Sequence, residues 1–107
     1  MSLEQGIELM RAERWFDAHE ALEDEWREAP APERDFLQGL VHVTVAWHHA
    51  AKGNRPGAER QLEKAARRLG PYAPSHRGVD VTRVLGQVEA AAARVAEGLL
   101  ELLPVRI

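Results

Sequence analysis

The chain of 107 residues lacks cysteine, any run of basic residues and any long apolar segment. Without a thiol it can form no disulfide and no thiolate-ligated zinc or iron–sulfur centre, so a bound metal must be held by histidine, carboxylate, amide or water. Because the formal net charge is -3 and basic runs are absent, we expect no nucleic-acid binding.

The sequence also has no feature of a targeting or membrane segment. Its first residues lack the basic and apolar regions of a signal peptide, and no apolar run approaches the roughly 20 residues that cross a bilayer. We therefore expect a cytoplasmic protein with no membrane partner.

Alternating β-branched residues, the pattern of a half-buried strand, are absent as well. Proline and glycine instead divide the chain into five segments of helical periodicity, which we expect to span residues 3–13, 17–28, 33–52, 56–69 and 81–102. Residues 72–79 are expected to form one long irregular loop. The sequence therefore predicts an all-α fold, with residues 1–107 forming a single helical domain built as a compact bundle of about five helices.

The ends of these segments carry further signals. Asp17 is expected to cap the second helix, with Glu20 completing a capping box, and Asp80 to cap the fifth. A short connection favours antiparallel packing of the second and third helices. The third and fourth helices, with small residues such as Ala58 and Ala65, are similar to a tetratricopeptide hairpin.

One face of the second helix carries an unusual set of side chains, namely Phe16, His19, Glu23 and Trp26. At 100° per residue we expect His19 and Glu23 to lie in the centre of its apolar face. A charge placed there must be paired, hydrogen-bonded or metal-bound. Four aromatic side chains are expected in the core of the protein, namely Trp15, Trp26, Phe36 and Trp47.

His19, Glu20 and Glu23 form a helical H-E-x-x-E string. Residues four apart project in the same direction and can chelate one ion, so the string is similar to the metalloprotease motif H-E-x-x-H, with Glu20 as general base. The simpler alternative is that Glu20 belongs to the capping box while His19 and Glu23 bond to each other. The residues alone leave both interpretations open.

The third helix has a stripe of uncharged polar side chains, Gln38, His42 and His49, with Val45 in the same sector. A stripe that faced water would be expected to include lysine or glutamate. We therefore expect a semi-buried stripe, which is either part of a functional pocket or a set of histidines satisfied within the core.

Together these residues resemble the bacterial and archaeal family called domain of unknown function 309. The resemblance rests on residues 16–27 (FDAHEALEDEWR), residues 36–40 (FLQGL), His49, Gly53-Asn54 and Gly57-Ala58. It implies a compact bundle of about five helices and, because the family is often labelled a predicted metal-dependent hydrolase, a metal-assisted activity.

Position by position, the family pattern falls on Phe16, His19, Glu20, Glu23, Trp26, Gln38, Gly39, His49, Asn54 and Gly57, with Asp80 before the last helix. The resemblance thus adds Asn54 and Asp80 to the candidate binding residues. His42 departs from the pattern, since relatives commonly have glutamine there, and this argues against His42 as a metal ligand.

The leading hypothesis is a metal-binding or metal-dependent hydrolase-like domain. In it His19, Glu23 and His49 ligate a divalent zinc, manganese or iron ion, Gln38 orients water or substrate, and Glu20 or Glu23 is the general base. Its further binding residues are His42, Asn54 and Asp80.

The alternative is a non-enzymatic helical binding or interaction module whose His/Glu/Gln cluster is a structural hydrogen-bond network. A small molecule or a peptide is the expected partner. A third hypothesis is a homodimer formed through an exposed apolar part of the last helix.

Overall fold

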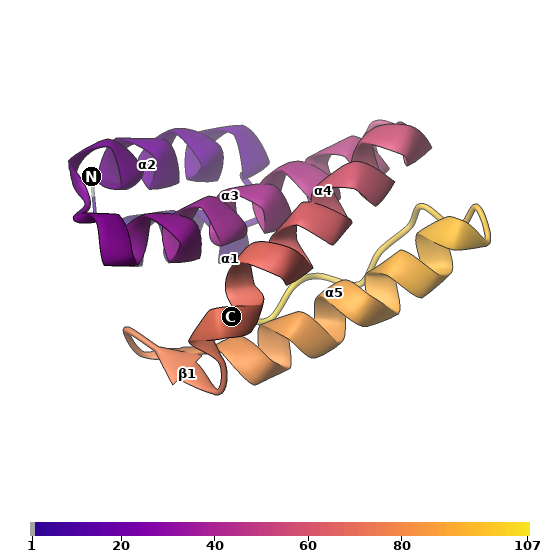
Figure 1. Cartoon of the computed structure of the whole chain (residues 1–107). Coiled ribbons are helices and arrows are strands. Elements are labelled where there is room, and N and C mark those ends of the chain that lie inside the picture. The colour runs from indigo at the N-terminus through magenta and orange to yellow at the C-terminus, as the bar shows by residue number, and fades with distance from the viewer. Residues whose placement is uncertain (1) are drawn as a thin grey trace.

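The computed structural model describes residues 2–107 and contains, within that range, five α-helices (Figure 1). They are α1 (Leu3–Arg11), α2 (Trp15–Glu28), α3 (Ala31–Ala51), α4 (Arg55–Leu69) and α5 (Val81–Ala96). A 3-10 turn (Gly70–Tyr72) follows α4, and two-residue strands, β1 (Ser75–His76) and β2 (Val79–Asp80), pair antiparallel before α5. None of the described helices is long and apolar enough to cross a membrane.

The longest helix, α3, lies in the middle of the bundle. α2 and α4 both pack against it, while α1 packs on α2 and α5 packs on α4 (Figure 1). The predicted all-α fold, with antiparallel α2 and α3 and a hairpin of α3 and α4, is confirmed.

The buried sides of α3 supply much of the core. Phe36, Leu37, Leu40 and Val43 are fully inaccessible to solvent. Of the four aromatic residues expected in the core, Phe36 and Trp47 are buried, whereas Trp15 and Trp26 are half-buried and pack against it. Thr44, the most deeply buried polar residue of α3, donates its hydroxyl to the Leu40 carbonyl at 3.1 Å and so needs no other partner.

α3 and α4 are in close contact at Gly39. A Cβ at this position would lie 2.6 Å from both Cγ and Cδ2 of Leu69, a side chain that is itself fully buried. No other residue leaves room for Leu69, so glycine is required here in spite of its low helix propensity.

The start of α2 differs from the prediction. The helix begins at Trp15, and Arg14 occupies the N-cap without a side-chain hydrogen bond. Asp17 lies inside the first turn and pairs with Arg14 at 2.6 Å, so the predicted capping box with Glu20 is wrong. The reason is that Trp15 packs against the core and extends the helix by two residues, after a turn in which Glu13 adopts a φ of 57°.

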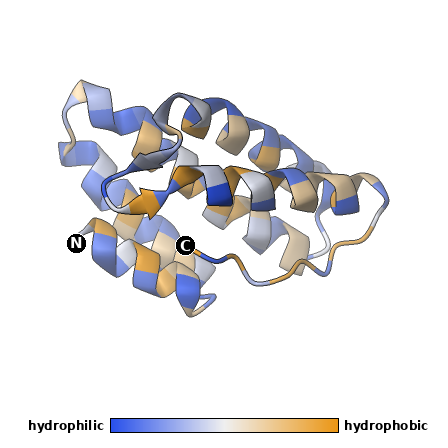
Figure 2. Ribbon diagram, turned by 90° about the horizontal axis from the view of Figure 1, so that it is seen from below, coloured by the Kyte–Doolittle hydropathy of each residue, from blue (hydrophilic) through white to orange (hydrophobic). Residues whose placement is uncertain are grey.

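The end of α5 differs as well. The helix stops at Ala96, and Gly98, with a φ of 81°, reverses the chain. Residues 99–107 then run back along the helices toward the N-terminal part of the bundle, as Figure 2 shows. Leu99 and Leu102 have helical spacing, but Leu99 is 45% exposed and Leu102 packs on the core from an extended segment.

The loop predicted for residues 72–79 contains instead the 3-10 turn and the β1–β2 hairpin. Arg77 and Gly78 make the hairpin turn, with φ angles of 47° and 79°. His76 packs edge-on against Phe36 at 4.7 Å between ring centroids and forms a 2.8 Å contact from Nε2 to Glu33 Oε1. Two-residue strands are too short for an alternating pattern, so the sequence did not reveal them.

Two glycine substitutions test the α3–α4 contact. We expect Gly39→Ala to lower the free energy of unfolding by about 1–3 kcal/mol, because Leu69 cannot move away from a new Cβ without disturbing the core. Gly86→Ala is the matched control: Gly86 is an exposed α5 residue, and a Cβ added there would have no neighbouring atom within 4 Å. It should raise stability by about 0.5–1 kcal/mol. Urea denaturation of both variants measures this, and a stabilised Gly39→Ala would contradict the close contact.

Candidate functional site

Three side chains of α3, spaced four residues apart, form what we call the α3 polar face: Arg34, Gln38 and His42. Residues at this spacing lie one above another on the same side of a helix. Each presents one buried atom with no hydrogen-bond partner among residues 2–107: Arg34 Nε, Gln38 Oε1 and His42 Nε2. Arg68 of α4 presents a fourth such atom, its Nε.

His42 is the most deeply buried member and is 8% exposed. Its Nδ1 lies 2.7 Å from Oε1 of Gln61 on α4, so Nδ1 carries the proton and Nε2 carries the lone pair. Burial lowers the pKa of His42; the Gln61 hydrogen bond opposes this, and the positive charges of Arg68, Lys64 and Arg67 lower the pKa further. His42 is therefore neutral at neutral pH, with a hydrogen-bond acceptor at Nε2.

Two arginines, Arg34 of the α3 polar face and Arg68 of α4, are held in place by separate contacts. The guanidinium of Arg34 lies 4.3 Å from the ring centroid of Trp26 on α2, within the range of a cation–π interaction. Arg68 Nη1 donates to Asp35 Oδ1 at 2.6 Å and so connects α4 to α3. These contacts leave the Nε–H donors of both arginines for another partner.

His19 and Glu23 contact each other on α2, with 3.5 Å between Nε2 and Oε1. Their side chains are 36% and 22% exposed, and Phe16 is 68% exposed. The prediction that this pair lies in the centre of an apolar face is wrong, because the buried side of α2 is formed by Ala18, Ala21 and Leu22. Ala18 and Ala21 let neighbouring helices approach, whereas Phe16, His19 and Glu23 lie at the border of this side or outside it.

His49 belongs to the turn between α3 and α4. Its Nδ1 lies 3.2 Å from Asn54 Nδ2, and Asn54 Oδ1 accepts a 3.0 Å hydrogen bond from the Gly57 backbone, which caps α4. A Cβ on Gly57 would lie 2.9 Å from His49 Cδ2, so the turn is tightly packed. Burial, followed by His48 and Arg60, lowers the pKa of His49.

The remaining predicted site residues are Asp80 and Glu20. Asp80 caps α5 by accepting a 3.0 Å hydrogen bond from the Arg83 backbone, as the sequence predicted. Glu20 is exposed on α2. Neither residue has a hydrogen bond to the α3 polar face in the described part of the chain.

The predicted metal ligands do not fit a three-ligand centre. His19 and Glu23 meet, but in residues 2–107 no three histidine, aspartate or glutamate side chains are arranged to hold one ion. His49 is engaged by Asn54. No hydrolytic step can be derived from this donor set, and metal binding by the His19–Glu23 pair stays a prediction.

Sequence reasoning found Gln38 and His42 but missed three of their neighbours. Arg34 precedes Gln38 by four residues, so the same helical periodicity that identified the stripe could have included it. Gln61 and Arg68 come from α4, and their approach depends on how α4 packs against α3. No feature of the sequence predicts which side of α4 faces α3.

Comparison with known proteins places the chain in a family. The family described as "Domain of unknown function (DUF309)" matches residues 3–61, so the chain belongs to it. A relative, the uncharacterized protein YpuF of Bacillus subtilis (strain 168), is 31% identical over 75 residues, which is 69% of this chain and 41% of YpuF. The chain thus spans less than half the length of this relative. No solved structure matches the chain.

The lowered pKa of His42 predicts how stability depends on pH. In the unfolded chain histidine takes up a proton near its ordinary pKa of about 6.5, whereas folded His42 does so only at lower pH, so acid favours unfolding. The contribution is complete above pH ~6.5 and is lost as the pH falls toward the lower folded pKa. His49 acts in the same direction.

We therefore expect the free energy of unfolding to fall between pH ~7 and ~5.5, and this slope to be smaller in His42→Gln and smaller still in His42→Gln/His49→Gln. Urea denaturation at a series of pH values measures the slope. An equal slope in the wild type and the double variant would contradict the burial of these rings.

Proposed function

We propose that this DUF309 protein is a non-enzymatic helical binding module whose site is the α3 polar face. The observation that carries the proposal is the pair of buried acceptors, Gln38 Oε1 and His42 Nε2, for which residues 2–107 supply no hydrogen-bond donor. Leaving a buried polar atom unpaired costs about 1–3 kcal/mol. Buried polar atoms without a protein partner are expected at functional sites, where a ligand supplies the missing hydrogen bond.

The chemistry of the unpaired atoms defines the class of ligand. Gln38 Oε1 and His42 Nε2 require a hydroxyl or N–H donor, whereas the Nε–H groups of Arg34 and Arg68 favour a carboxylate or another anionic oxygen. Lys64 adds positive charge near His42. A small anion with a hydroxyl or amine beside its carboxylate, such as a hydroxy acid or an amino acid, offers both the donor and the anionic acceptor that these groups lack.

The positions of the other candidate residues support binding over hydrolysis. Asn54 and Asp80 cap helices, and His49 is packed into the α3–α4 turn. Of the two residues predicted as the general base, Glu20 is exposed and Glu23 contacts His19. Asn54, Asp80 and His49 thus have structural roles that need no catalytic explanation, while Gln38 and His42 retain atoms that no structural role uses.

The His19–Glu23 pair supports a second candidate, the binding of a divalent cation. A histidine and a carboxylate at i and i+4 can both contact one ion. The distance of 3.5 Å between Nε2 and Oε1 allows both atoms to face the same ion. Two protein ligands leave the remaining coordination positions to water or a bound anion, so the expected affinity is low.

A panel of paired small acids tests the proposed ligand class. α-Hydroxy and α-amino acids should raise the melting temperature, whereas the matching acids without the hydroxyl or amine should have a much smaller effect. At about 100 times its Kd, a ligand stabilises the fold by about 2.7 kcal/mol and raises the melting temperature by roughly 10 °C or more.

The shift should disappear in Gln38→Met and persist in His48→Gln, a control on the same helix outside the α3 polar face. A shift that survives Gln38→Met would place the ligand elsewhere. If none of the acids changes the melting temperature, the proposed class of ligand is wrong.

Zinc titration of tag-free protein tests the second candidate. We expect weak stoichiometric binding by calorimetry that is lost in both His19→Ala and Glu23→Ala, because each removes one of two protein ligands. His48→Ala, which removes a histidine from another helix, is the control. Zinc binding that is unchanged in His19→Ala would contradict a site at this pair.

A further inference from the structure

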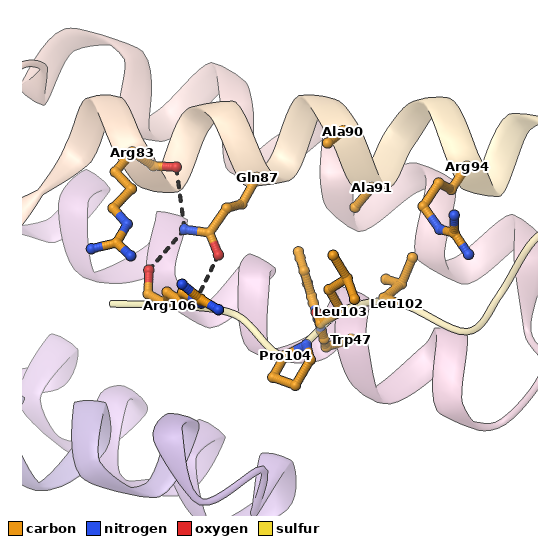
Figure 3. A pocket seen from close by; sticks show the side chains of 10 residues that line it. All are labelled: Trp47, Arg83, Gln87, Ala90, Ala91, Arg94, Leu102, Leu103, Pro104 and Arg106. Atoms are coloured by element: carbon orange, nitrogen blue, oxygen red, sulfur yellow. Dashed lines mark hydrogen bonds between the residues drawn. The ribbon is translucent and has the colours of Figure 1, made fainter.

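A cavity between α5 and the C-terminal segment 99–107 lies away from the α3 polar face. It has a volume of about 360 Å³, within the ~300–1,000 Å³ range of small-molecule sites. Figure 3 shows Ala90 and Ala91 on the α5 side, facing Trp47, Leu102, Leu103 and Pro104. The lining is therefore apolar in its middle part.

Small residues on α5 leave the space open. Ala90 and Ala91 occupy the turn of α5 that faces Trp47, where a larger side chain would fill the cavity (Figure 3). Trp47 is 5% exposed, and its Nε1 donates to the Leu103 carbonyl at 2.9 Å, which fixes the indole plane. A fixed aromatic surface opposite two alanines fits the flat or extended apolar body of a ligand.

The C-terminal wall of the cavity is attached to the helices by several hydrogen bonds. The Gln87 side chain donates to the Arg106 carbonyl and accepts from the Arg106 amide, both at 2.7 Å (Figure 3). Arg94 Nη2 donates to the Glu101 carbonyl at 3.1 Å, and Arg11 Nη2 donates to the Ile107 carbonyl at 2.7 Å. The wall is thus preformed, and ligand binding need not order it.

Three arginines line the cavity: Arg83 and Arg106 at one end and Arg94 at the other (Figure 3). Arg83 and Arg94 are eleven residues apart, which corresponds to about 16 Å along a helix. Within residues 2–107, none of the three forms a salt bridge with a carboxylate. Arg94 is engaged by the Glu101 carbonyl, whereas no hydrogen bond of the described residues uses the guanidinium of Arg83 or Arg106.

We propose that this cavity binds an amphipathic carboxylate, such as a medium-chain fatty acid, with its carboxylate between Arg83 and Arg106 and its apolar chain on Trp47, Ala90 and Ala91. Guanidinium groups pair with carboxylates through charge-assisted hydrogen bonds. The apolar lining gains from covering a hydrocarbon chain. The site shares no residue with the α3 polar face and is independent of the proposed function.

Calorimetric titration with decanoate, below the concentration at which it forms micelles, tests the proposal on the whole chain. We expect saturable one-to-one binding and a shift of the Trp47 indole N–H signal in the NMR spectrum. Decanol, which has the same chain without the charge, should bind at least tenfold more weakly. Equal binding of decanol and decanoate would overturn the assignment of the arginines, and the absence of saturable decanoate binding would overturn the site.

Three variants locate the ligand within the cavity. Arg83→Gln should weaken decanoate binding about tenfold, while Arg67→Gln on α4, outside the cavity, should leave it unchanged. Ala90→Phe fills the cavity from an exposed α5 position, so it should abolish binding with an unchanged melting temperature. Binding that persists in Ala90→Phe would contradict the proposal, and a Trp47 signal unmoved by decanoate would do so without any variant.

Discussion

The contact of Gly39 with Leu69 sets how closely α4 packs against α3, and much of the structure depends on that packing. Because Leu69 lies against position 39 where no Cβ is present, α4 covers one flank of α3 while α2 covers another. The strip of α3 between these flanks carries Arg34, Gln38 and His42. The same packing brings Gln61 to His42 and Arg68 to Asp35. A small residue in the core therefore influences the surroundings of the polar groups on the neighbouring side of the helix.

Helix periodicity predicted the five helices. It failed where side-chain size and not hydrophobicity decides burial. On α2 the bundle buries Ala18 and Ala21, while Phe16 remains 68% exposed. At the C-terminus, Leu99 and Leu102 continue the spacing of α5, but Gly98 takes a positive φ and the chain reverses. Local conformation at a single glycine thus overrides a regular pattern.

At the candidate site, the residues of α3 could be predicted from the sequence, whereas those contributed by α2 and α4 could not. Gln38 and His42 were identifiable because a stripe without lysine or glutamate is unusual on an exposed helix face. The partners of that stripe come from α4, which contributes Gln61 and Arg68, and from α2, which contributes Trp26 beneath Arg34. The predicted group of His19, Glu23 and His49 requires three residues to converge, and spacing along single helices gives no information on that convergence. Membership of DUF309 supports a shared fold.

The function proposed for the α3 polar face depends on Gln38 Oε1 being buried without a partner from the protein. The most direct measurement is the free energy of unfolding of Gln38→Met without ligand, because methionine has a similar shape and removes the amide. If the atom is unpaired, the variant should be more stable by about 1 kcal/mol, because the protein no longer buries an amide oxygen that lacks a hydrogen bond. A loss of about 1 kcal/mol or more would mean that the wild-type amide already makes a hydrogen bond, and this would contradict the proposed site.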